Sequence, residues 1–463
     1  TAFVEQVSDL SSQRRDLDQL RSAHLYYQIL LDPAAGSREF LDLLTQAGND
    51  VPLQSLLVME MQRLLPDAGG TTGVGQAIAD AVRTFHTWLT GTSPGSYVDI
   101  GIGIAGYLMR NERPVEALRI LRRLPVDAAE PLQRYRVDHL TGNACLRIPG
   151  RVKDGEAYLL HALHRAEVMA QPRAKLVAEA FKELGFYYRN EGLWRQADDA
   201  YRKAHDAIYG TYSSRSSDID REELASIRTN WAYVKGLRGD CREGQDLVEG
   251  AIGTRRRLGN QAGEGNAWSV HGELCRFDSQ YERAWESYLR AEELFQRLRS
   301  WGWLGQVYQQ QAICLLQAMQ QKGANLVGDK DPFQEAEERV VLALDLCRNH
   351  APRWYPAALN RAGRIFGRRD VDAGLNYLAA GIRRAHELSD GWFWFANLVE
   401  YAEMSYRAWL ATGQEEYRRQ VTMHGSQIPT VMSEYTFPHL AGRWYLLQGH
   451  LAVSQAPADG DLS

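Results

Sequence analysis

Residues 181–204 read FKELGFYYRNEGLWRQADDAYRKA, and this stretch decides the fold. Small residues recur at Gly185, Ala197 and Ala204, and large side chains occupy positions between them. Where two helices cross closely, small residues let the backbones approach, and large side chains fill the space beside the crossing. Gly192 interrupts the pattern and is a typical turn residue. The stretch therefore predicts two antiparallel helices joined by a turn at Gly192.

The same arrangement of small and large residues recurs along most of the chain. A second clear copy runs from Trp268 to Ala291, and a weaker one contains Trp231, with Lys235 where an aromatic residue is expected. The small residue that opens the second helix of each pair recurs at positions 117, 155, 197, 244, 284, 336 and 373. These intervals exceed the roughly 34 residues of the standard repeat of this kind. We therefore expect long helices and inserted turns, including a loop at 323–332.

Together these residues resemble the tetratricopeptide repeat (TPR), over about residues 97–452. The resemblance implies an all-α fold, a right-handed TPR-like α-solenoid of antiparallel helix pairs. The long repeats are similar to the helical arrays at the C-terminal end of bacterial signal-transduction ATPases and transcription activators. They are also similar to those of the peptide-sensing regulators of Gram-positive bacteria. On this resemblance we expect a protein- or peptide-binding module, the sensor or regulatory part of a bacterial signalling or defence protein.

The chain is expected to divide into three parts. Helical spacing in residues 1–92 predicts an N-terminal helical unit, and the glycine-rich segment 69–73 marks its boundary with the array. Residues 93–454 are expected to form the TPR-like α-solenoid, and residues 455–463 a flexible tail. The chain does not begin with Met, which indicates a processed start or a piece of a longer protein.

Composition and charge argue against two classes of partner. The net charge is −5, with basic and acidic residues interspersed, whereas nucleic-acid binders usually carry a basic excess or stripe. No window approaches 18 consecutive apolar residues, so no membrane span is expected. The five cysteines are widely spaced and form no CxxC pair, which is typical of reduced, buried thiols in a cytoplasmic protein.

Three motifs resemble chemical sites but fit structural roles better. The segment 101–106 (GIGIAG) has the glycine spacing of a dinucleotide-binding loop, yet it lies in a predicted helix and not after a strand. The segment 70–77 (GTTGVGQA) resembles a phosphate-binding loop but lacks its lysine and hydroxyl residues. His161 and His164 have no third metal ligand at useful spacing. We therefore expect no cofactor, no metal site and no catalytic residue.

The most informative positions lie on the first helix of each predicted pair, which lines the concave face of such a solenoid. Asn, Arg, Gln and aromatic side chains at positions not used for packing suit an extended peptide, because they can bond its backbone and pack its side chains. The expected ligand- or partner-binding residues are Lys182, Phe186, Arg189, Asn190, Thr229, Tyr233, Asn266, Glu273, Arg276, Phe277, Gln309, Gln310, Asn360 and Arg364. The alternative is that these residues are simply a solvated inner face.

Three functional hypotheses remain open on the sequence. The first is the sensor array of a regulatory protein, which binds a protein or peptide in its groove. The second is a free-standing scaffold or adaptor in a bacterial complex. The third is an enzyme or accessory subunit with a site in the concave groove. The tryptophan pairs 301/303 and 392/394 add a further alternative, because they could form an exposed patch for a partner or fill wedges between repeats.

Overall fold

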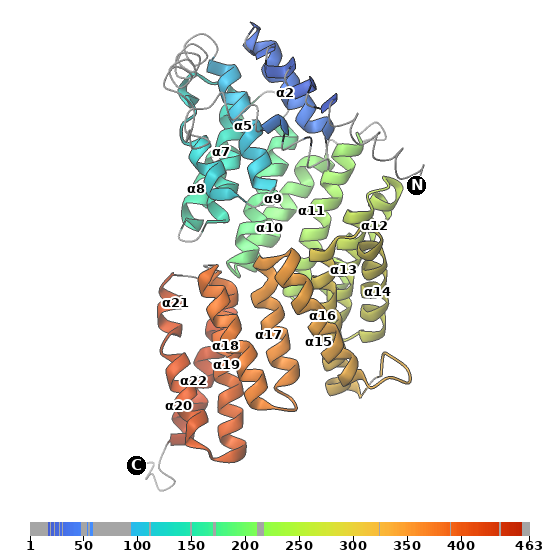
Figure 1. Cartoon of the computed structure of the whole chain (residues 1–463), viewed down its shortest axis with the longest axis vertical. Helices are drawn as coiled ribbons and strands as arrows, with labels where there is room; N and C mark the ends of the chain where they lie inside the picture. Colours follow the sequence, from blue (N-terminus) through green and yellow to red (C-terminus); the bar gives the residue numbers. More distant parts are fainter. Residues whose placement is uncertain are drawn as a thin grey trace, which may run out of the picture. The chain divides into compact units, whose positions relative to one another are not determined.

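A computed structural model describes residues 94–455, except for 111–112, 149–150, 170–172, 211–216, 324, 389 and 435–436. It also describes residues 17–18, 20–22, 24–26, 28–29, 31–47, 53 and 56–58. Within these residues all assigned elements are helices (Figure 1), which confirms the predicted all-α fold. The segments 69–73 and 70–77, most of 1–92 and the tail after residue 455 lie outside the described residues.

The chain consists of two compact units, residues 1–180 and 181–463, which we call unit 1 and unit 2. The boundary falls within helix α9 (Arg173–Asn190). The described helices of unit 1 are α2 (Pro33–Ala47), α5 (Pro94–Arg110), α6 (Pro114–Leu121), the short 3₁₀ helix η1 (Val126–Ala128), α7 (Pro131–Leu146) and α8 (Val152–Val168).

The glycine motif at 101–106 lies inside α5 of unit 1 and serves helix packing. A Cβ atom added at Gly103 would come within 2.7 Å of Phe40 Cε1 on α2, and one at Gly101 would meet the side chain of Leu124. The two glycines therefore let α5 approach its neighbours closely. His161 and His164 are both exposed on α8, as expected for solvent-facing side chains.

Unit 2 is a run of helix pairs. Its elements after α9 are α10 (Trp194–Tyr209), α11 (Asp218–Leu237), α12 (Cys241–Arg257), α13 (Gln261–Phe277), α14 (Tyr281–Arg297), α15 (Trp301–Lys322), α16 (Pro332–His350), η2 (Pro352–Trp354), α17 (Tyr355–Phe366), α18 (Val371–Glu387), α19 (Gly391–Thr412), α20 (Glu415–Gly425), α21 (Ile428–Glu434) and α22 (Pro438–Gln455). Successive helices pack against each other, α11 on α12, α13 on α14 and α15 on α16 (Figure 1). The predicted TPR-like solenoid is confirmed.

The pairs α9/α10 and α13/α14 cross where a glycine faces a tyrosine ring. A Cβ atom added at Gly185 would lie 2.9 Å from the ring of Tyr201, and one at Gly272 would collide with the ring of Tyr288. Both tyrosines are fully buried. The turn predicted at Gly192 is present, with φ of 72°, a left-handed conformation that favours glycine. The inserted loop predicted at 323–332 lies between α15 and α16.

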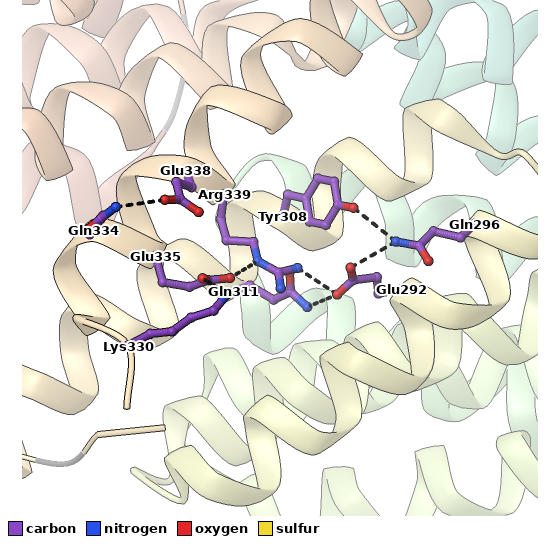
Figure 2. A network of polar contacts seen from close by, with 9 residues as sticks. All are labelled: Glu292, Gln296, Tyr308, Gln311, Lys330, Gln334, Glu335, Glu338 and Arg339. Carbon is purple, nitrogen blue, oxygen red and sulfur yellow. Dashed lines mark hydrogen bonds and ion pairs between the residues drawn. The ribbon is translucent and has the colours of Figure 1, made fainter. Parts of the chain in front are cut away.

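An arginine-centred network ties α14, α15 and α16 together (Figure 2). Arg339 on α16 donates from Nη1 to Glu292 Oε2 on α14 and to Gln311 Oε1 on α15, both at 2.8 Å. Its Nε donates to Glu335 Oε1, also at 2.8 Å. Glu335 is buried, and Lys330 pairs with it as well. One guanidinium thus satisfies acceptors on three helices, which fixes the spacing of two adjacent pairs.

Unit 2 also makes a contact between its beginning and its end. The His439 ring at the start of α22 lies between two tryptophans, 5.2 Å from the Trp194 ring of α10 and 4.8 Å from the Trp392 ring of α19. A Cβ atom at Gly192 would lie 3.2 Å from Pro438 Cδ, so a larger residue would press on this contact. We call this group of residues the closing contact. It joins the first repeat of unit 2 to its last helix.

Replacing Gly272 with alanine tests the glycine–tyrosine crossing. The added methyl group has no room beside Tyr288, so overpacking should lower the free energy of unfolding by about 1–3 kcal/mol. Gly442→Ala is the matched control, because no atom lies within 4 Å of its Cβ position and alanine favours a helix. Urea unfolding followed by circular dichroism measures the free energy of unfolding of both variants. An equal change in Gly272→Ala and Gly442→Ala would contradict the assigned crossing.

Replacing Arg339 with methionine tests the network of Figure 2. The change removes the only cation paired with Glu292 among the described residues and one of the two paired with Glu335, and both carboxylates are mostly shielded from water. The free energy of unfolding should therefore fall by about 2–3 kcal/mol. The comparison is Arg297→Met, which breaks an exposed pair with Glu293 and should cost about 0.5 kcal/mol. If the free energy of unfolding falls no further in Arg339→Met than in Arg297→Met, the network does not hold the three helices together.

Candidate functional site

The odd-numbered helices of unit 2 line its inner face. Helix α11 contacts α13, α13 contacts α15, α15 contacts α17, and α17 contacts α19. In the described residues, each of these contacts is more extensive than any contact between successive even-numbered helices. In a curved array the helices come closest on the inside of the curve. The predicted site residues therefore lie on the helices that face the interior.

Several of the predicted residues form a ladder of hydrogen bonds between neighbouring inner helices. Lys182 Nζ donates to Glu223 at 2.7 Å, and Arg189 Nη1 donates to Asn230 at 3.0 Å, which joins α9 to α11. On the next inner helices Ser269 Oγ donates to Gln310 Oε1 at 2.5 Å. All of these bonds span 41 residues, the length of one repeat. The ladder holds the inner helices in register.

Three predicted residues lie between helices and not on an open surface. Thr229 is buried, and its hydroxyl donates to Ala225 O and accepts from Arg255 Nη1. Gln309 is buried against Cys347 Sγ, and Asn360 donates to Asn397 Oδ1. Their side chains are occupied by neighbouring helices, because each lies on the flank of its helix, next to the contact with the following one.

A strip of alternating aromatic and guanidinium groups crosses the inner face. The Arg189 guanidinium lies over the Phe186 ring at 4.7 Å and over the Tyr233 ring at 5.6 Å. The Tyr233 ring lies 6.2 Å from Phe277, over which Arg276 lies at 4.7 Å. Phe186, Arg189, Tyr233 and Phe277 are half-buried, so part of each faces solvent, whereas the Arg276 side chain is only 11% exposed. We call this group the aromatic–arginine strip; it spans α9, α11 and α13.

Glu273 and Arg276 form a buried ion pair at the α13 end of the strip. Arg276 donates from Nε and Nη2 to the two carboxylate oxygens at 3.0 and 2.7 Å, and Tyr288 donates to Oε1 at 2.6 Å. Arg276 also donates to Gln317 on α15. Burial alone would raise the pKa of Glu273, but Arg276 and Tyr288 hold the pKa below its ordinary value. The pair is therefore charged at neutral pH.

Arg361 on α17 is half-buried and is not among the predicted site residues. Its positive charge acts to lower the pKa of both Tyr233 on α11 and Glu273 on α13, against the burial that raises them. Burial and the charges of Arg364 and Arg276 lower the pKa of Arg361 to about 10. Arg361 shares a helix face with the predicted Arg364, three positions later.

Arg364, Asn190 and Asn266 complete the set of predicted positions. Arg364 Nε lies 3.9 Å from Glu400 Oε1, a carboxylate that also pairs with Arg443 at 3.0 Å. Asn190 is exposed and accepts a weak hydrogen bond from Arg189. Asn266 is half-buried on α13. The structure thus joins the strip to the Glu273 pair through Arg276 and leaves Asn190 exposed.

One constellation resembles a catalytic triad but is sealed from substrate. His271 Nδ1 lies 2.8 Å from Ser287 Oγ, and His271 Nε2 lies 3.5 Å from Glu249 Oε1. Both Ser287 and His271 are buried, and the serine hydroxyl donates to Arg283 O. A nucleophile must reach its substrate, and this hydroxyl is enclosed between helices. Among the described residues no group of three or more His, Cys, Asp or Glu could hold a metal ion.

The two tryptophan pairs have different surroundings. Trp392 and Trp394 pack into the C-terminal core of unit 2, against Phe437 and His386 respectively. Trp301 and Trp303 remain 37% and 43% exposed at the start of α15. The first pair therefore fills a wedge between repeats. None of the helices that the structure describes is both long and apolar enough to cross a lipid bilayer.

No family model and no curated protein matches this sequence. Similar solved structures include a Rap protein complexed with competence and sporulation factor, at 13% identity and TM-score 0.48, covering 77% of this chain and 99% of that one. Another is a signal transduction ATPase (STAND) protein with a tetratricopeptide repeat sensor from Pyrococcus horikoshii, at 13% identity and TM-score 0.45, covering 86% and 57%. BtubC from P. vanneervenii matches at 16% identity and TM-score 0.38, covering 51% and 91%. These likenesses are distant, and the fold is assigned on the helix pairs themselves.

Replacing Arg276 with methionine tests the buried pair. The Glu273 carboxylate would lose its partner, so the free energy of unfolding at pH 7 should fall by about 2–4 kcal/mol, and adding Glu273→Gln should restore part of it. Because the folded pKa of Glu273 is lowered, the stabilisation is complete above the ordinary value of 4.5 and is lost as the pH falls through the folded pKa. Urea unfolding at pH 7 and pH 4 measures this.

The control for the buried pair is Arg384→Met, which breaks an exposed pair with Glu387. It should cost about 0.5 kcal/mol. Two results would show that Glu273 does not depend on Arg276. One is an equally small fall in the free energy of unfolding for Arg276→Met, and the other is a fall that is as large at pH 4 as at pH 7.

Proposed function

We propose that the inner face of unit 2 binds an extended peptide or protein segment. The observation that carries this proposal is the aromatic–arginine strip, which spans three helices and remains partly open to solvent. Half-buried aromatic rings provide contact area at low entropic cost, and guanidinium groups bond backbone carbonyls. The spacing of the strip over successive repeats suits a ligand that is itself extended.

The ladder supports this function because it makes the binding surface rigid before a ligand arrives. Arg189 is held by Asn230, and Arg276 is held by Glu273 and Gln317. A surface that is already ordered loses little conformational entropy on binding. We infer that the chain acts as the recognition part of a bacterial regulatory or signalling protein, in which occupancy of the interior is the signal.

The cellular setting we propose is the cytoplasm. The five cysteines are all buried and unpaired. Burial raises the pKa of Cys314 to about 12 and that of Cys275 and Cys347 to about 11, so these thiols stay protonated and unreactive at neutral pH. Unpaired thiols of this kind fit a reducing compartment.

Selection from a synthetic library of random hexapeptides tests the function. The full chain is incubated with the library, and retained peptides are identified by mass spectrometry after gel filtration. We expect a related set of peptides to be retained, and Phe186→Ala and Phe277→Ala to weaken their binding about 10-fold each, because each removes a ring of the strip.

The control for the peptide selection is Tyr445→Ala, which removes an exposed aromatic side chain from α22, a helix that contributes no residue to the strip. It should leave peptide binding unchanged. Thermal melting of each variant separates a lost contact from a lost fold. Retention of no peptide, or equal loss in Tyr445→Ala, would contradict the proposed function.

A further inference from the structure

The turn between α14 and α15 carries exposed tryptophans that the inner face does not use. Trp301, Trp303 and Leu298 are all exposed within this one short segment. The Trp303 ring stacks on Phe295 of α14, with 5.9 Å between the ring centroids, which fixes its orientation. Tryptophan is enriched among the residues that carry most of the energy of protein interfaces. Grouped apolar side chains that stay open to solvent therefore mark this turn as a candidate interaction surface.

The end of α16 lies against the same turn. A Cβ atom added at Gly302 would lie 3.1 Å from the Cβ atom of Ala351, and the Trp301 ring lies 6.3 Å from the His350 ring. His350 and Arg348 are both exposed in the last turn of α16. The aromatic residues of one turn thus adjoin the basic residues of the other.

Arg299, between the two tryptophans and α14, has a backbone conformation that favours glycine. Its φ is 52°, and Gly259, at the corresponding position one repeat earlier, has a φ of 69°. A side chain is strained in this left-handed conformation, so glycine would fit the turn better. The Arg299 guanidinium is exposed and makes no hydrogen bond, ion pair or ring contact with any residue that the structure describes. It therefore adds nothing to the fold and is available to a partner.

The charge beside the tryptophans is opposite in sign to that of the whole chain. Neither Arg299 nor Arg348 pairs with a carboxylate in the described ranges, although the chain has a net charge of −5. On the same helices, Glu293 is neutralised by an arginine four residues later, and Asp345 accepts a hydrogen bond from an asparagine. A basic residue in the last turn complements the helix dipole, which accounts for Arg348. It does not account for Arg299, which lies beyond the end of α14.

We propose that this surface docks an acidic segment of another protein. We call it the tryptophan edge, and it consists of Leu298, Arg299, Trp301, Trp303, Arg348 and His350. A guanidinium group matches a carboxylate with two parallel N–H donors, and the indole rings pack against apolar side chains. The partner segment is therefore one in which Asp or Glu residues are interspersed with apolar ones. This docking goes beyond the peptide binding proposed above, because the tryptophan edge shares no residue with the aromatic–arginine strip.

Arrays of synthetic dodecapeptides test the tryptophan edge. In one set about half of the positions are Asp or Glu and the rest are mostly Leu, Phe or Trp; the matched set has Asn and Gln in place of the acids. We expect the full chain to bind members of the acidic set and to bind their amide counterparts at least about 10-fold more weakly. Replacing both Trp301 and Trp303 with alanine should weaken binding of the acidic peptides about 10-fold or more.

Arg299→Gly separates a lost contact from a lost fold. It should weaken binding of the acidic peptides about 3- to 10-fold, because it removes a guanidinium group. Its Tm should be no lower than that of the wild type, because glycine relieves the left-handed backbone. Unchanged affinity in Arg299→Gly and in the double tryptophan variant would overturn the docking surface, and a lowered Tm in Arg299→Gly would show that Arg299 serves the fold.

The control for charge is Arg419→Gln, which removes one positive charge from the exposed surface of α20 and should bind the acidic peptides as the wild type does. Phe186→Ala should also leave this binding unchanged, and Arg299→Gly should leave hexapeptide binding unchanged, so the two proposals can fail separately. Equal binding of the acidic and amide sets would overturn the acidic partner. Tighter binding of oligothymidylate than of the acidic peptides would overturn it in favour of single-stranded nucleic acid. Dimerisation in analytical ultracentrifugation that Arg299→Gly abolishes would overturn it in favour of a second copy of this chain.

Discussion

The structure depends on the close crossing of two helices at a glycine that faces a tyrosine ring. At Gly185 with Tyr201 and at Gly272 with Tyr288, the absence of a side chain lets the second helix of the pair lie directly on the first. This contact fixes the distance and angle within a pair. Once each pair has the same internal geometry, stacking pairs brings the odd-numbered helices together on one side, and that side becomes the inner face.

The inner face has two tasks that compete for the same side chains. The side chains of Lys182 and Ser269 hydrogen-bond to the next inner helix and make the inner face rigid. Arg189 and Arg276 do both, because each bonds a neighbouring helix through one edge of the guanidinium and covers an aromatic ring with its face. A flat, many-donor group suits this double role, which a lysine ammonium could not fill. Polarity on the inner face is therefore a poor guide to what a ligand touches.

The sequence predicts the helix pairs well because their determinants are local: Gly185, Gly192 and Tyr201 lie within one short stretch. Even the irregular Lys235 obeys the same geometry, since it takes an aromatic position and is satisfied there by Asp198 and Glu243. The binding residues remain a prediction. Helical periodicity identifies the helix but not which flank a neighbouring helix covers, so the sequence alone could not show that Thr229 and Gln309 are buried.

The closing contact of Trp194, His439 and Trp392 changes how unit 2 can respond to force. A helical array with free ends deforms gradually, because a load changes its pitch by a small amount at every repeat. In an array whose two ends are in contact, displacing one segment displaces all the others. Ring contacts of this kind contribute only about 1 kcal/mol each, less than the crossings within a pair. The two ends of unit 2 can therefore separate at the cost of these ring contacts, while the crossings within each helix pair stay intact.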